Sequence, residues 1–109
     1  MGVALREQIH QAAINIAGAG DNTIIPGVAG KLTTIVGLVL VNNIGTTSIT
    51  VKDGATVLTG AMLLAAGIPL VLPVDATVDW FQSTVAGNNF ILNLGAATQV
   101  SGMVWYVQN

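Results

Sequence analysis

Alternation of apolar and polar positions, broken at short intervals by turn residues, is the dominant pattern of the chain. Residues 46–52 (TTSITVK) alternate strictly, and Asp53-Gly54 follows them. An Asp-Gly pair favours a two-residue hairpin turn, so residues 56–59 are expected to return as the partner strand. The pattern therefore predicts a β-hairpin centred on Asp53-Gly54.

Four further segments have the length and composition of strands. Residues 31–43 are β-branched and apolar on both faces, which indicates a central strand in a two-layer core. In residues 90–94 the apolar side chains Phe90, Leu92 and Leu94 share one side, whereas residues 98–108 are partly apolar on both sides, as in a strand inside the fold or at a subunit contact. Prolines flank residues 69–74 and favour an edge strand or a strand end.

These segments together predict an all-β protein of one domain. Seven to nine short strands joined by Gly, Asn and Asp turns, with no long helical pattern after residue 17, are typical of an antiparallel β-sandwich or a small barrel. Residues 1–12 are expected to form an N-terminal arm, helical or extended, and residues 13–109 the single β-sandwich domain.

An uncharged stretch from Gly54 to Val74 has the length of a membrane-spanning helix. Two prolines and two internal glycines interrupt it, and each proline costs a helix about 3 kcal/mol. Strands are therefore favoured over a span: the return strand of the hairpin, a loop at 65–67, and the strand at 69–74. No membrane partner is expected.

The composition limits the classes of partner. Of the 109 residues 52% are hydrophobic and only 7% charged, and the net charge is −2. Soluble proteins usually have about 25% charged residues, so the surface is expected to be neutral and hydroxyl-rich or covered by partners. Without a basic face, binding of nucleic acid is not expected. The absence of cysteine excludes disulfides, thiolate catalysis and zinc–sulfur sites.

Candidate catalytic and metal-binding residues are few. His10 is the only histidine and has no serine or threonine nearby in sequence to activate. Asp75 and Asp79 could converge on a cation, but Ca²⁺ requires six to eight oxygens. Asp21-Asn22-Thr23 is interpreted as a turn. The sequence therefore predicts no enzyme, no cofactor and no metal site.

Two pairs, Trp80-Phe81 and Trp105-Tyr106, contain all the aromatic residues except Phe90. Such pairs stack on sugar rings in carbohydrate-binding modules, but more often they close a sandwich core or anchor a subunit interface. We take these four residues as candidate interface residues. Leu5 and Ile9 of the arm are added to them, as contacts to a shell or to a neighbouring subunit.

A series of short motifs resembles a known group of proteins. In order they are GDNT (20–23), VAGK (28–31), LTGAM (58–62), WF (80–81), LNL (92–94) and QVSG (99–102). Their order and spacing are similar to those of small β-rich structural proteins of tailed bacteriophages, over about residues 14–109.

This resemblance implies a jelly-roll-like sandwich and a structural virion protein. The expected role is capsid decoration: a cement protein that binds the major capsid protein on the outer head surface as a homo-oligomer, with a trimer favoured. A tail-fibre or receptor- and glycan-binding sandwich is the alternative that the resemblance leaves open. Low charge agrees with the first role, because obligate interfaces are depleted in charged residues.

Overall fold

The computed structural model describes residues 9–75 and 77–109 of the chain. Within these residues the regular elements are all strands: β1 (His10–Ile16), β2 (Gly20–Ile25), β3 (Thr33–Asn42), β4 (Thr46–Asp53), β5 (Thr56–Val57), β6 (Met62–Ala65), β7 (Leu70–Leu72), β8 (Phe81–Gln82), β9 (Phe90–Leu94) and β10 (Val100–Gln108).

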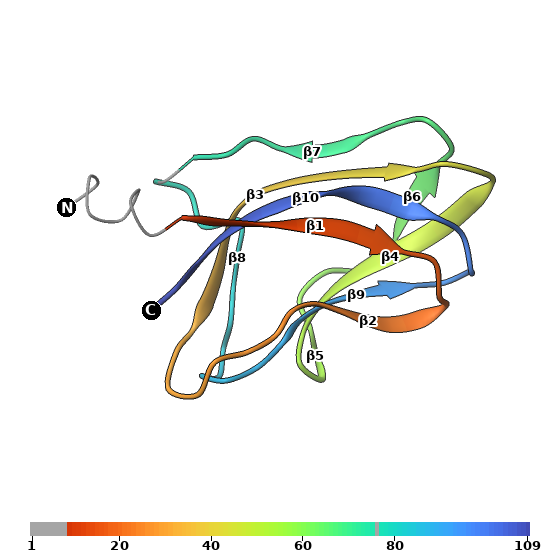
Figure 1. The fold of residues 1–109 in the computed structure, drawn as a ribbon. Helices are drawn as coiled ribbons and strands as arrows, with labels where there is room; N and C mark the ends of the chain where they lie inside the picture. The colour runs from red at the N-terminus through yellow and green to blue at the C-terminus, as the bar shows by residue number, and fades with distance from the viewer. Residues whose placement is uncertain (1–8, 76) are drawn as a thin grey trace.

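The strands form two antiparallel sheets that face each other (Figure 1). Sheet A has the order β1-β10-β3-β7, with β8 also paired to β3, and sheet B has the order β2-β9-β4-β5, with β6 also paired to β4. The chain crosses between the sheets six times, from β1 to β2, β2 to β3, β3 to β4, β6 to β7, β8 to β9 and β9 to β10, as in a jelly roll. The predicted all-β, antiparallel and jelly-roll-like sandwich is confirmed.

The hydrophobic core lies between the sheets and takes alternate residues from the longer strands. On β9, for example, Phe90, Leu92 and Leu94 face the core, whereas Asn93 between them does not. Burial of each such side chain contributes about 1.5–3 kcal/mol. The buried cluster consists of Ile14, Ile25, Ile35, Leu38, Leu40, Ile49, Val51, Leu64, Phe90, Leu92, Leu94, Val100 and Val104.

Strand predictions hold for the long elements. The segment 31–43 forms β3, which is paired on both sides, and the proline-flanked segment 69–74 forms the short edge strand β7. The hairpin at 46–59 is present, but Lys52 pairs with Val57 and Asp53 with Thr56, so the turn residues are Gly54 and Ala55. Asp53 therefore belongs to the strand and not to the turn.

Two local interpretations are wrong. Asp21, Asn22 and Thr23 lie within β2 and not in a turn, because β2 pairs with β9, a segment about seventy residues away. The first strand begins at His10, so residues 10–12, assigned above to the arm, belong to sheet A. Residues 1–8 of the arm, including Leu5, lie outside the described residues.

The uncharged stretch from Gly54 to Val74 contains three short strands, β5, β6 and β7. β5 and β6 pair with β4 in sheet B, and β7 pairs with β3 in sheet A, so this stretch forms one margin of both sheets. The described residues contain no helix that is long and apolar enough to cross a membrane. The sequence pattern did not predict β6 as a separate strand.

A buried asparagine holds together the end of the sandwich where four turns meet. The turns β1–β2, β3–β4, β6–β7 and β9–β10 gather at the end opposite the C-terminus (Figure 1). The Nδ2 group of Asn42, fully buried, donates hydrogen bonds to the carbonyl oxygens of Gly45 (3.0 Å) and Leu64 (3.1 Å). The backbone carbonyl of Asn42 accepts a third bond from Gly67 N–H (2.8 Å). Asn42 thereby links the β3–β4 turn to the β6–β7 turn.

Replacement of Asn42 by alanine is expected to lower the free energy of unfolding by about 2–3 kcal/mol, because two backbone carbonyls lose their donors and one of those bonds is buried. Urea unfolding at a fixed protein concentration measures the loss. The matched control is Asn43→Ala: the next residue is exposed, so its replacement should change the stability by less than about 0.5 kcal/mol. Equal effects of the two variants would contradict the linking role of Asn42.

Candidate interaction surface

The outer face of sheet A is apolar from one edge of the sheet to the other. Across the four strands, Ala13 on β1 aligns with Met103 on β10, Met103 with Val39 on β3, and Val39 with Val71 on β7. Paired residues point to the same side of a sheet. The residues that flank this row belong to the core, so the row itself points away from the core. No charged residue interrupts it.

A second apolar row lies beside the first. Trp105 on β10 pairs with Gly37 on β3, and the register shifts by one residue between Trp105 and Tyr106. A Cβ atom at Gly37 would lie 2.5 Å from Cγ2 of Val74, so Val74 packs over this glycine where another residue would place its side chain. The loop after β7 thus adds Val74 to the face.

Polar residues border this surface. Gln11 on β1 aligns with Trp105, Asn15 aligns with Ser101, and Gln82 on β8 aligns with Thr34. We define the apolar sheet face as Ala13, Val39, Val71, Val74, Met103 and Trp105. An apolar centre with a polar rim is the usual composition of a protein–protein interface.

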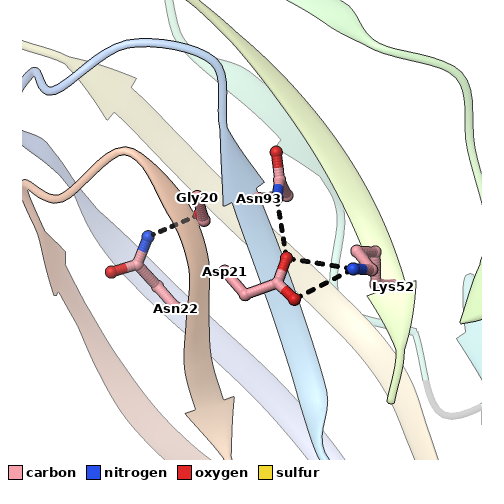
Figure 2. A network of polar contacts seen from close by, with 5 residues as sticks. All are labelled: Gly20, Asp21, Asn22, Lys52 and Asn93. Atoms are coloured by element: carbon pink, nitrogen blue, oxygen red, sulfur yellow. Dashed lines mark hydrogen bonds and ion pairs between the residues drawn. The ribbon is translucent and has the colours of Figure 1, made fainter. Parts of the chain in front are cut away.

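The outer face of sheet B has the opposite character. Its corresponding row is polar: Asp21 on β2 aligns with Asn93 on β9, and Asn93 with Thr50 on β4. Figure 2 shows the carboxylate of Asp21 between Asn93 and Lys52. Asn93 Nδ2 donates to it at 2.7 Å, and Lys52 Nζ lies 3.0 and 2.9 Å from its two oxygens. The hydrogen bond from Asn93, and then the contacts with Lys52, lower the pKa of Asp21.

Three strongly exposed apolar residues lie in or next to the turns at the end of the sandwich where the turns gather. They are Ile44 in the β3–β4 turn, Leu63 on β6 and Ile68 in the β6–β7 turn, which are 76%, 74% and 63% exposed. We call these three residues the apolar tip. The Asn42 hydrogen bonds fix the two turns that carry Ile44 and Ile68. Side chains this exposed and this apolar are normally covered by a partner when they gather on one surface.

The predicted interface residues divide between the core and the surface. Phe81 and Tyr106 are half-buried and pack against the buried cluster of their own chain. Trp105 lies on the apolar sheet face. Trp80 is 36% exposed and its Nε1 donates to the carbonyl of Pro73 (2.9 Å), which holds the loop that carries Val74.

The arm contributes one described residue to this set. Ile9 is half-buried and precedes β1, whereas Leu5 lies outside the described residues. His10 is paired with Tyr106 in the sheet, with ring centroids 5.6 Å apart.

A buried carboxylate lies at the end of β4, where the sequence pattern had placed a turn residue. Asp53 is only 2% exposed, and its Oδ2 accepts hydrogen bonds from the backbone N–H (2.6 Å) and the hydroxyl (2.8 Å) of Thr84. Burial raises the pKa of Asp53, but the hydrogen bonds of Thr84, Asn88 and Ser83 together outweigh burial and lower the pKa. The carboxylate therefore stays ionised and fastens the β8–β9 loop to the end of β4.

Neither of two cavities near polar groups is large enough for an organic cofactor. The one beside Asp53 measures about 10 Å³, enough for about one water molecule. The other, lined by Asp79, Thr34 and Val107 among others, measures about 130 Å³, against roughly 300–1,000 Å³ for a typical ligand pocket. Asp75 accepts hydrogen bonds from Thr77, and the described residues contain no cluster of three metal-ligating side chains.

Several residues of the two apolar surfaces were not singled out from the sequence: Val39, Val71 and Met103 of the face, and all three residues of the tip. A signal for the face was present, since residues 31–43 and 98–108 are apolar on both sides. What the sequence could not supply was the register that brings Met103 and Val39 into one row.

Comparisons with known proteins identify a shared fold. No protein-family model and no curated protein matches the chain. A solved structure described as "Bacillus endospore appendages form a novel family of disulfide-linked pili" is similar, with a TM-score of 0.55 and 14% sequence identity, over 92% of this chain and 84% of that chain. At this identity the similarity establishes the β-rich fold alone. The present sequence contains no cysteine.

The free energy of unfolding is expected to fall as the solution is acidified below the ordinary range for aspartate. The pKa of Asp53 is lower in the folded chain than in the unfolded chain. Its contribution to stability is therefore complete above the unfolded pKa and is lost as the pH falls through the folded pKa. In Asp53→Asn this part of the pH dependence should disappear. Urea titrations between pH 2.5 and pH 7 measure it.

Asp79→Asn is the matched control for that experiment, because it removes the same charge from an exposed position. An Asp53→Asn variant whose stability falls with acidification as steeply as that of Asp79→Asn would rule out the role assigned to Asp53.

Proposed function

We propose that this protein is a structural subunit of a repeating assembly, and that the assembly is a viral capsid whose outer surface the protein decorates. In this role it binds the major capsid protein, acts without a cofactor and catalyses no reaction. The proposal rests on the apolar sheet face. This surface has no charged residue, and its central row takes one residue from each of β1, β10, β3 and β7.

The distribution of apolar surface supports a subunit with two contacts. The apolar sheet face and the apolar tip lie on different parts of the sandwich, and both are built from residues held by backbone pairing or by the Asn42 hydrogen bonds. A decoration protein buries surface both against its own copies and against the shell. Attachment at several points then gains avidity, so no single contact needs high affinity.

A filament subunit is the second candidate, and the structural similarity to a pilus protein favours it. The similar protein is described as a member of a family of disulfide-linked pili. Because the present sequence has no cysteine, a filament of this chain would depend on non-covalent contacts. A filament forms when one surface of a subunit contacts a different surface of the next subunit and the rotation between them does not close a ring. Apolar residues at two separate places on one subunit are compatible with such contacts.

Immunogold electron microscopy of virions and filaments purified from cultures that carry the gene tests the proposal. Label in a regular array over the heads is expected. Label along free filaments would favour the second candidate, and label at the tail would favour a fibre or receptor-binding module. Absence of label from every particle would contradict a role in any of these assemblies.

The apolar tip provides a mutational form of the same test. Ile68→Asp, at a 63% exposed position in a turn, is expected to leave folding intact and to reduce the label on heads by at least about tenfold, because a buried unpaired charge costs several kcal/mol. Val85→Asp is the control, since Val85 is 57% exposed in the β8–β9 loop, away from the tip residues. Equal labelling of the two variants would exclude the tip from attachment.

A further inference from the structure

We draw no further inference here: the strongest candidate, the apolar sheet face on the outside of sheet A, carries nothing beyond the proposed function, because β7 aligns with β3 over only three residues, Val39, Met103 and Trp105 are already half-buried, and nothing in the structure shows what covers the remainder.

Discussion

The antiparallel pairing of β3 with β10 is the interaction on which the rest of the structure depends. It extends from Val100 opposite Asn42 to Gln108 opposite Thr33, and it is the longest pairing in the described fold. β1 is attached to the other side of β10, and β7 and β8 are attached to the other side of β3. Because the side-chain period of a strand is two, this one register decides which residues of sheet A enter the core and which form its outer face.

A one-residue slip in this pairing would turn the side chains of one strand to the opposite face. If β10 slipped along β3, Val104 would leave the core and Met103 would enter it. Both sets are apolar, so hydrophobicity alone discriminates weakly between the two registers. Two positions on β3 favour the observed register: Asn42, at one end of the pairing, is buried with two hydrogen-bond acceptors, and Gly37, near the middle, accommodates Val74. When the outward face of a strand is as apolar as its inward face, hydrophobicity favours the native register only weakly. An outward face of this composition is consistent with one that another protein covers.

The features that could be predicted from the sequence are those set by residues close together in the chain, and the features that were missed depend on contacts between distant residues. The strands β3, β4, β9 and β10 follow from alternation and β-branched residues, which are local properties. The turn at Asp21–Thr23 was misread because a pairing with β9 overrides the local preference of Asp and Asn for turns. Asp53 was assigned to the hairpin turn because its partner Thr84 is 31 residues away. The apolar sheet face needed three successive registers across four strands, none of which is encoded near any one of its residues.

The low charge of the chain follows from the way the sandwich divides its surface. Each sheet has one face in the core, so its outer face is the only face of the sheet that can be hydrated. Sheet B uses its outer face in the usual way, with Asp21, Lys52 and Asn93 in a hydrogen-bonded group (Figure 2). Sheet A does not: its central row is as apolar as the core rows beside it. Val39 and Met103 are half-buried and Val71 is 49% exposed in the single chain, so a covering protein would bury the remainder of these side chains and add the free energy of that burial. The low charge of the sequence thus agrees with a fold in which the outer face of one of the two sheets has an apolar centre and a polar border without charges.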